Sequence, residues 1–184
     1  MSNPAAPTTV GSLNLSGNAM AVVGIGNTIV VASSDNGSEV QVISVTTPSA
    51  PTLIGTVDLG GNIDGSAVAG TIIPGTGPVA MVGRLDGTVA IITTSLTSTY
   101  GGAGGAVNDI TLSGDGHLMF LATTSGSAEF QAVDISNLTA PVQISLLNLA
   151  NPLNGIFYDP NYDRVFAASQ TDTSELIIIK PQLL

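Results

Sequence analysis

Cysteine and tryptophan are absent from the 184-residue chain, and lysine and arginine together number three. Without cysteine the chain has no disulfide, no reactive thiol and no thiolate metal ligand, and the single histidine, His117, supplies too few nitrogen ligands for a zinc site. The three basic residues are set against 13 acidic ones, which gives a net charge of −10. A chain this acidic has little with which to neutralise phosphate groups, so we expect neither nucleic acid nor an anionic membrane surface as a partner.

Long apolar runs are also absent, although the mean hydropathy is +0.45. No stretch approaches the roughly 18 apolar residues of a membrane-spanning helix, so we expect no membrane insertion. The apolar residues form short runs separated by Gly, Asn, Asp and Pro, which is typical of many buried strands. Only 9% of the residues are charged, and this composition favours an extracellular or cell-surface location. The first residues show no signal-peptide pattern, so that location needs a removed or unconventional export signal.

What the chain does have is a motif that occurs three times. The motif is Ala-Pro, then a β-rich run, then Asn or Asp followed by Leu, and it occupies residues 6–15, 50–59 and 140–149. Its prolines are 44 and 90 residues apart, which corresponds to one step and two steps of about 45 residues. Such a period indicates a repeat architecture.

Each repeat contains three short strand-like runs, and the motif supplies a fourth. The repeats span residues 18–59, 62–105, 107–149 and 151–184. In the second repeat the fourth run has no proline and leads into the glycine-rich residues 101–105, so we expect an irregular edge there. The last repeat stops after three runs, whereas the motif at residues 6–15 precedes the first repeat.

These features predict one all-β domain over residues 1–184: a β-propeller with four four-stranded blades, in which the N-terminal strand completes the last blade. Such closure covers a sheet edge that would otherwise pair with other chains. The strands fit three arrangements equally well: one closed chain, an eight-bladed ring of two chains, or a polymer. In each, Val10, Leu13 and Leu15 supply the packing of the added strand.

Four segments resemble known propeller repeats. Residues 134–142 (DISNLTAPV) and 45–55 (VTTPSAPTLIG) resemble the VDVSNPxxPxLVG core of LVIVD repeats, and residues 112–122 (LSGDGHLMFLA) and 158–168 (YDPNYDRVFAA) resemble the SPDGRxLYVA segment of YVTN-type surface-layer propellers. The chain is thus similar to bacterial and archaeal LVIVD/YVTN-type β-propeller proteins over nearly its whole length. The resemblance implies the propeller fold and specifies no activity.

Aligning the inner strands of the repeats gives one recurring polar position. It is occupied by Asn18, Asp64, Asn108 and Asn154, at spacings of 46, 44 and 46 residues. Around a propeller axis these side chains would form a ring of oxygen ligands suited to Ca²⁺ or Na⁺. The alternative is that short polar side chains at strand starts bond the backbone, and one carboxylate among four ligands is few for Ca²⁺.

No catalytic arrangement is evident. No serine lies in a Gly-x-Ser-x-Gly sequence and no Gly-x-x-x-x-Gly-Lys loop is present, so we expect no enzyme and no cofactor. His117 lies in a turn pattern, where a solvent-facing side chain is expected. The leading hypothesis is a non-enzymatic extracellular structural or protein-interaction propeller that self-assembles by terminal strand exchange, with itself or another protein as partner. The alternatives are a cation- or ligand-binding propeller with an axial site and, by fold analogy alone, a lactonase or hydrolase.

Overall fold

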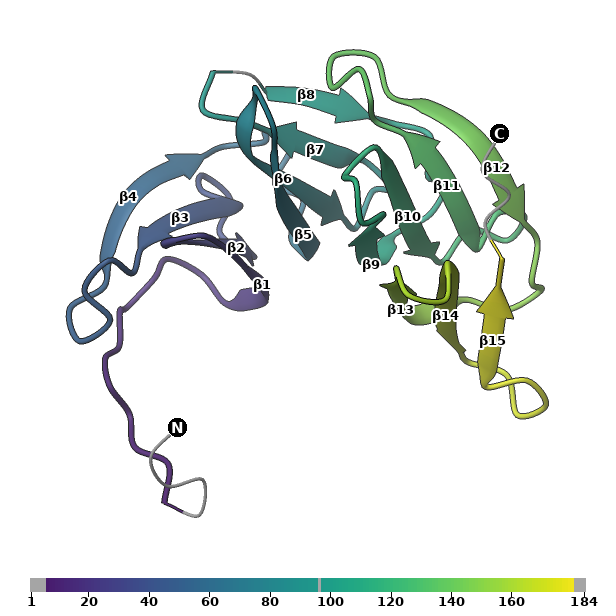
Figure 1. Cartoon of the computed structure of the whole chain (residues 1–184), viewed down its shortest axis with the longest axis horizontal. Helices are drawn as coiled ribbons and strands as arrows, with labels where there is room; N and C mark the ends of the chain where they lie inside the picture. The colour runs from purple at the N-terminus through teal and green to yellow at the C-terminus, as the bar shows by residue number, and fades with distance from the viewer. Residues whose placement is uncertain (1–5, 96, 181–184) are drawn as a thin grey trace.

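The structure, a computed structural model, describes residues 6–95 and 97–180. Over these residues the chain forms fifteen strands and no helix, and the strands make four antiparallel sheets (Figure 1). It follows that this part of the chain has no helix long and apolar enough to cross a membrane. The all-β prediction is confirmed, as is the number of sheets.

Within each sheet the strands are neighbours in chain order. Sheet 1 contains β1 (Ala19–Ile25), β2 (Thr28–Ser33), β3 (Val40–Ser44) and β4 (Thr52–Val57). Sheet 2 contains β5 (Gly65–Ile73), β6 (Gly77–Arg84), β7 (Val89–Ile92) and β8 (Thr97–Tyr100). Sheet 3 contains β9 (Val107–Leu112), β10 (Leu118–Thr123), β11 (Phe130–Asp134) and β12 (Val142–Leu147). Sheet 4 contains β13 (Leu153–Asp159), β14 (Arg164–Ser169) and β15 (Leu176–Ile179).

Short turns explain why consecutive strands pair. The two residues between β1 and β2 include Gly26, whose φ of 62° lies in the left-handed region that favours glycine. In other turns an aspartate accepts a backbone N–H two residues ahead, as Asp35 does from Gly37 at 3.0 Å. Local residue chemistry therefore returns each strand beside the previous one.

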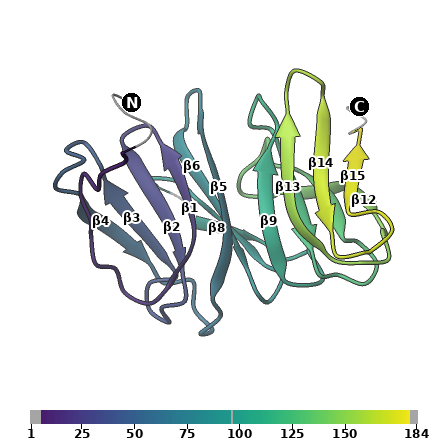
Figure 2. The same ribbon diagram turned by 90° about the horizontal axis from the view of Figure 1, so that it is seen from below.

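The four sheets stand side by side in chain order along an open arc (Figure 1). Their first strands, β1, β5, β9 and β13, lie next to one another on the inner side of the arc, which is also visible from below (Figure 2). The fourth strands β4, β8 and β12 lie on the outer side. Each interior sheet thus has a neighbour on both faces, while sheets 1 and 4 each have only one.

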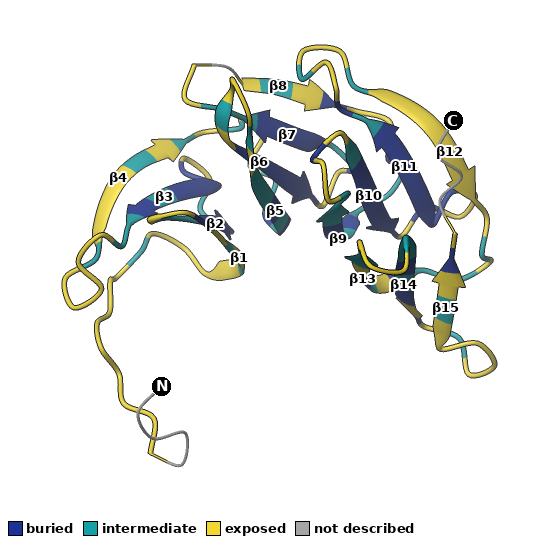
Figure 3. Cartoon of the chain, viewed as in Figure 1, coloured by how far each residue is buried: buried dark blue, intermediate teal, exposed yellow. Residues whose placement is uncertain are grey.

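Apolar clusters between consecutive sheets form the core. One cluster joins sheets 1 and 2, one joins sheets 2 and 3, and one joins sheets 3 and 4. In the last of these, Phe120 is fully buried and stacks on Phe130 and Tyr158 with ring centroids 5.9 and 5.5 Å apart. Phe166, at the matching position of β14, is only half-buried because sheet 4 has no further sheet on that side. The burial pattern follows the arc, with dark central strands and exposed outer ones (Figure 3).

The predicted N-terminal strand does not form within the single chain. Residues 6–18 form no strand, and Gly11 lies so close to the Pro48 carbonyl oxygen that a Cβ on Gly11 would clash with it. The segment therefore lies beside sheet 1, whereas the unpaired edge of β15 is at the other end of the arc (Figure 1). A strand needs a partner edge to be stable, and within one chain this edge is out of reach. Closure within the chain is thus not observed.

Replacing Phe120 with alanine tests the packing between sheets 3 and 4. The substitution leaves a cavity in a fully buried site, so we expect it to lower the free energy of unfolding by about 3–5 kcal/mol in urea denaturation. Tyr162→Ala is the control, because this aromatic is 71% exposed and its loss should change stability by about 0.5 kcal/mol or less. Equal losses for the two variants would contradict the described packing.

Candidate interaction site: the two ends of the sheet array

The four residues of the predicted cation ring do not share one structural position. Asn18 and Asp64 directly precede β1 and β5, and their carbonyl oxygens accept N–H groups from the hairpin partner at 3.0 and 3.3 Å. Asn108 and Asn154 lie two positions further along, inside β9 and β13. The residues that match Asn18 and Asp64 in sheets 3 and 4, by the same backbone bond, are Ala106 and Pro152. The matching residues are 46, 42 and 46 residues apart, so the nearly even spacing of the predicted ring conceals an offset of two residues.

Asn108 and Asn154 belong instead to a set of bulge residues. Each inner strand has a register irregularity at its second residue, and these residues are Met20, Ser66, Asn108 and Asn154. The Ser66 hydroxyl donates to the Val107 carbonyl at 2.6 Å, and the Asn108 amide donates to the Leu153 carbonyl at 2.7 Å. Each bond joins a bulge to the first residue of the next inner strand. These polar side chains therefore connect consecutive sheets through the backbone.

Asn154 is the last residue of this set. Its amide oxygen accepts a hydrogen bond from Gln170 at 2.6 Å, and within residues 6–95 and 97–180 its amide N–H₂ has no acceptor. No group of three or more His, Cys, Asp or Glu that could hold a metal ion occurs in the described part of the chain. The axial cation site stays a prediction, and calcium titration followed by thermal unfolding tests it, because a cation bound only by the folded state raises the Tm.

His117 lies in the turn between β9 and β10. Its backbone N–H donates to the Asp115 carboxylate at 3.1 Å, and the Ser113 hydroxyl donates to the same oxygen at 2.5 Å. These hydrogen bonds, that from Ser113 first, hold the pKa of Asp115 below its ordinary value of 3.8. Turn formation accounts for all three residues.

Asp109 is a carboxylate that sequence reasoning missed. It lies in β9, and its two oxygens accept the N–H of Ile110 at 2.8 Å and the N–H of Ile156 in β13 at 2.8 Å. Burial raises its pKa above the ordinary value of 3.8, although both hydrogen bonds act in the opposite direction. Asp109 is therefore a second polar connection between the inner strands of sheets 3 and 4. The only signal in the sequence is a lone carboxylate within an otherwise uncharged strand pattern.

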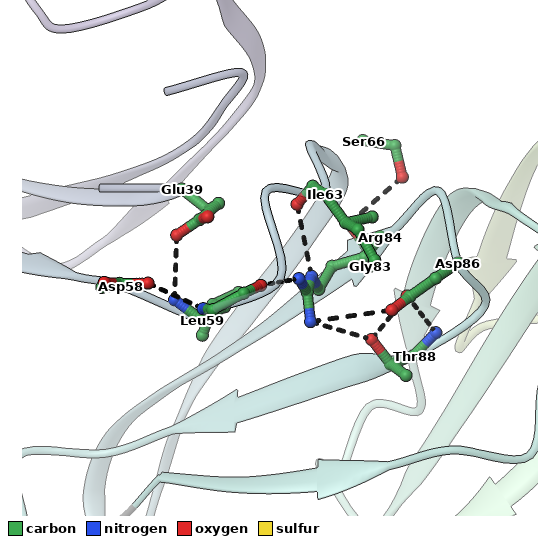
Figure 4. Close-up of polar contacts among 10 residues, drawn as sticks. Glu39, Asp58, Leu59, Ile63, Ser66, Gly83, Arg84, Asp86 and Thr88 are labelled. Atoms are coloured by element: carbon green, nitrogen blue, oxygen red, sulfur yellow. Dashed lines mark hydrogen bonds and ion pairs between the residues drawn. The ribbon is translucent and has the colours of Figure 1, made fainter. Parts of the chain in front are cut away.

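Two buried glutamates hold the ends of the outer strands. Glu39 accepts the Leu59 N–H at 2.8 Å, and Glu129 accepts the Leu149 N–H at 2.8 Å (Figure 4 for Glu39). Both glutamates are almost completely buried, with 0% and 1% exposure. Leu59 and Leu149 are the final residues of the repeated motif. A carboxylate from the third strand's start thus fixes the end of the fourth strand in sheets 1 and 3.

Arg84 performs a related task in sheet 2. Its guanidinium is largely buried, donates to the carbonyl oxygens of Gly60 and Ile63, and forms an ion pair with Asp86 at 3.7 Å (Figure 4). These contacts bind the segment that enters sheet 2 from sheet 1. One of the few cations in the chain is therefore used inside the fold.

The outward face of sheet 4 is apolar and uncovered. Phe157, Leu176 and Ile178 are 60%, 65% and 61% exposed. In sheet 3 the positions that match Leu176 and Ile178 are Phe130 and Ala132, and both are buried against sheet 4. The face that packs on the next sheet elsewhere in the array therefore has no partner at this end.

The other end of the array carries the predicted interaction residues. Val10 is 66% exposed, Leu13 is 38% exposed and Leu15 is half-buried. On β1, Val22 points away from sheet 2 and is 64% exposed. Next to this segment, Ser16 exchanges two hydrogen bonds with the Gln41 side chain, at 2.6 and 3.2 Å. The chain is thus fixed to sheet 1 from Ser16 onward, and its motif segment lies largely open to solvent.

No family model matches this chain, and no curated protein matches it. A solved structure of similar fold is the crystal structure of the computationally designed Ika4 protein, with a TM-score of 0.72. The alignment covers 95% of this chain and 99% of that chain at 16% sequence identity. At this identity the likeness concerns the fold alone.

The raised pKa of Asp109 makes a prediction about stability and pH. A folded-state pKa above the unfolded one means that the native chain binds the proton more tightly, so the Asp109 contribution to stability falls as the pH rises above 3.8 and levels off above the folded pKa. The difference in free energy of unfolding, wild type minus Asp109→Asn, should therefore decrease with pH in that window. Denaturant titrations at several pH values measure it.

Asp115→Asn is the matched control for that experiment. The pKa of Asp115 is lowered, so its contribution is present above pH 3.8 and is lost as the pH falls through the folded pKa. The wild-type minus Asp115→Asn difference should consequently increase with pH. Two differences that change with pH in the same direction would refute the assignment of Asp109.

Proposed function

We propose that this chain is a non-enzymatic extracellular structural module, a β-propeller segment of four blades that self-assembles by exchanging its N-terminal strand. One observation carries the proposal: sheet 4 has three strands and an uncovered apolar face, while the motif that forms the fourth strand of sheets 1 and 3 lies unpaired at residues 6–15. The adjacent inner strands and the arc of sheets support the propeller arrangement (Figure 1). The location outside the cell is proposed from the weakly charged composition.

The strand is supplied by a second copy. Residues 6–15 and the edge of β15 lie at opposite ends of the arc, so one chain cannot join them without leaving this arrangement (Figure 1). Two arcs related by a twofold axis satisfy both ends at once, because each chain donates one strand and accepts one. The product is a ring of eight sheets, which is within the range of propellers, gives sheet 4 its fourth strand and leaves no end face of the array uncovered.

Apolar contact accounts for the affinity of such a pair. The outward face of sheet 4 would cover the face of sheet 1 that includes Val22, just as each interior face covers the next. Full burial of one large apolar side chain contributes about 1.5–3 kcal/mol, and three are available on sheet 4 alone in Phe157, Leu176 and Ile178. Ordering of the incoming strand and the lost freedom of the two chains offset part of this gain.

Leu13 and Leu15 have a place in the same contact. Their counterparts in sheet 1, Val57 and Leu59, pack on the apolar cluster between sheets 1 and 2. By the register of sheets 1 and 3, a strand added to β15 would set Leu13 opposite Leu176 and Gly11 opposite Ile178, with Leu15 two residues beyond Leu13 on the same face. The donated strand would therefore extend the apolar face instead of interrupting it.

Removing residues 1–15 tests the exchange. We expect the full-length chain to have the mass of two chains in size-exclusion chromatography with light scattering, and the truncated chain to have the mass of one, because the truncation removes the added strand. Deletion of residues 1–5 is the control, since it leaves the motif intact. A truncated chain of unchanged mass would rule out exchange, and a mass well above two chains would replace the pair with a polymer.

A charge on the outward face of sheet 4 tests the apolar contact separately. Ile178→Asp places a carboxylate where the pair buries an apolar side chain, so association should weaken by more than about a hundredfold, as measured by sedimentation. Because Ile178 is exposed in the single chain, its fold should be retained, which circular dichroism checks. Ile72→Asp is the matched control, with an exposure of 59% at the end of a hairpin outside the contact. Similar weakening in both variants would point to net charge and not to this face.

A further inference from the structure

We infer that Glu175 is the group that binds the incoming strand: in the assembled pair its carboxylate accepts the Leu15 N–H of a second copy of this chain. The inference rests on the proposed strand exchange and assigns the atoms that recognise the strand. Three glutamates, one in each of sheets 1, 3 and 4, share one position in their sheets.

The three residues are Glu39, Glu129 and Glu175. Each directly precedes the third strand of its sheet, which is β3, β11 or β15. Each also accepts, through its carbonyl oxygen, a backbone N–H from the second strand: that of Ser33 at 2.8 Å, Thr123 at 2.8 Å and Ser169 at 2.9 Å. The backbone therefore sets the three glutamate side chains in equivalent places.

In sheets 1 and 3, the carboxylate at this position binds the last residue of the motif strand. Glu39 and Glu129 bind the N–H of Leu59 and Leu149, in both cases 20 residues later and at 2.8 Å. Both leucines end the Ala-Pro motif, and Leu15 is the matching residue of the N-terminal copy. Leu15 is half-buried, and its N–H donates to no group within the described residues.

Glu175 occupies the equivalent position in sheet 4, but within the described residues no motif strand lies beside β15. It is exposed, and its carboxylate accepts no hydrogen bond within residues 6–95 and 97–180, where no fourth strand follows β15. An exposed carboxylate needs no partner, but the two equivalent ones are buried and bonded as soon as the motif strand is present. The Glu175 carboxylate would become buried and hydrogen-bonded in the same way if residues 6–15 of a second copy paired with the edge of β15.

Sheet 2 shows that the glutamate accompanies the motif. Its fourth strand, β8, has no Ala-Pro motif, and the matching position is Thr88, whose carbonyl accepts the Arg84 N–H at 3.0 Å. Sheets with a motif strand thus have glutamate, and the sheet without one has threonine. Sheet 4 has the glutamate, so its chemistry matches a motif strand that another copy supplies.

The way in which the chain enters sheet 1 also agrees with a motif strand that pairs with another copy. The Ser16 carbonyl accepts from the Gln41 side chain at 2.6 Å, and in sheet 3 the Ala103 carbonyl accepts from Gln131, the matching residue of β11, at 2.7 Å. Ala103 connects the fourth strand of sheet 2 to sheet 3. Ser16 therefore enters sheet 1 as a chain does when it leaves the fourth strand of a preceding sheet.

Glu175→Ala in the full-length chain is the direct test. A hydrogen bond to a charged acceptor that becomes buried is strong, so its loss should weaken association by about ten- to a hundredfold in sedimentation equilibrium. Asp172→Ala is the matched control, because it removes an exposed carboxylate from the same loop and changes the net charge equally. Glu175→Gln keeps an acceptor oxygen of similar shape and should recover part of the affinity.

Hydrogen exchange at the Leu15 amide is the second readout. In the wild-type pair this amide should be protected, and in Glu175→Ala it should exchange faster at a concentration where both are paired. A chain with Glu175→Ala still has its own N-terminal strand, so it should bind the chain that lacks residues 1–15, which retains Glu175. That mixture should form a pair joined on one side only.

The outcomes separate this inference from the proposed exchange. If truncation of residues 1–15 dissociates the pair while Glu175→Ala associates as tightly as Asp172→Ala, the exchange stands and the role of Glu175 is overturned. Unchanged Leu15 exchange in Glu175→Ala overturns it as well. If the truncated chain keeps the mass of the full chain, the exchange itself fails. Capture of another protein's strand in place of a second copy would appear as a wild-type chain that stays single at all concentrations.

Discussion

The packing of one apolar sheet face on the next is the interaction on which this structure depends. Every sheet has two such faces, and the clusters between sheets 1 and 2, 2 and 3, and 3 and 4 consist of side chains from both members of each pair. A linear array of sheets always leaves two end faces uncovered. The exposed Phe157, Leu176 and Ile178 follow from this rule and are not a local defect of sheet 4. Only closure into a ring, or coverage by another molecule, removes both ends.

Polar groups set the order within that apolar packing. Ser66 and Asn108 connect consecutive inner strands at the bulges, Asp109 adds a carboxylate bond, and Glu39 and Glu129 fix the outer strands. Each of these groups is bonded to a backbone N–H or carbonyl. Apolar contact is not directional, whereas a hydrogen bond to one backbone atom is. The combination gives sheets that pack closely and in a single register.

The repeat pattern of the sequence was enough to predict the elements. Short apolar runs between turn residues predicted sixteen strands in four sheets; within the described residues fifteen strands form, and the one predicted at residues 6–15 does not. These features depend on local chemistry, such as Gly26 in a tight turn. Burial is less local: Phe120 is fully buried between sheets 3 and 4, whereas Phe166 at the matching position is half-buried, because burial depends on whether a next sheet exists.

The site residues were harder to predict because they depend on register and on distant neighbours. Asn18 and Asn108 looked equivalent by spacing, yet one precedes its strand and the other occupies a bulge, and a shift of two residues is invisible in composition. Glu39 and Glu129 were missed, although each stands 20 residues before the final leucine of a motif. The sequence shows that spacing, but only the structure shows that the pair is a hydrogen bond. The role proposed for Glu175 comes from comparison with these two glutamates.

The net charge of −10 bears on how such an array avoids unspecific association. Two chains repel each other at a distance, and at physiological salt this repulsion is screened beyond about 8 Å. Apolar faces attract only at contact, so they favour association where the two surfaces match. Where the surfaces do not match, charge repulsion disfavours association. The unpaired edge is also short, since β15 has four residues, and the exposed Glu175 lies at its start. A strand that cannot bond this carboxylate leaves a charge to be buried, which selects against foreign edges.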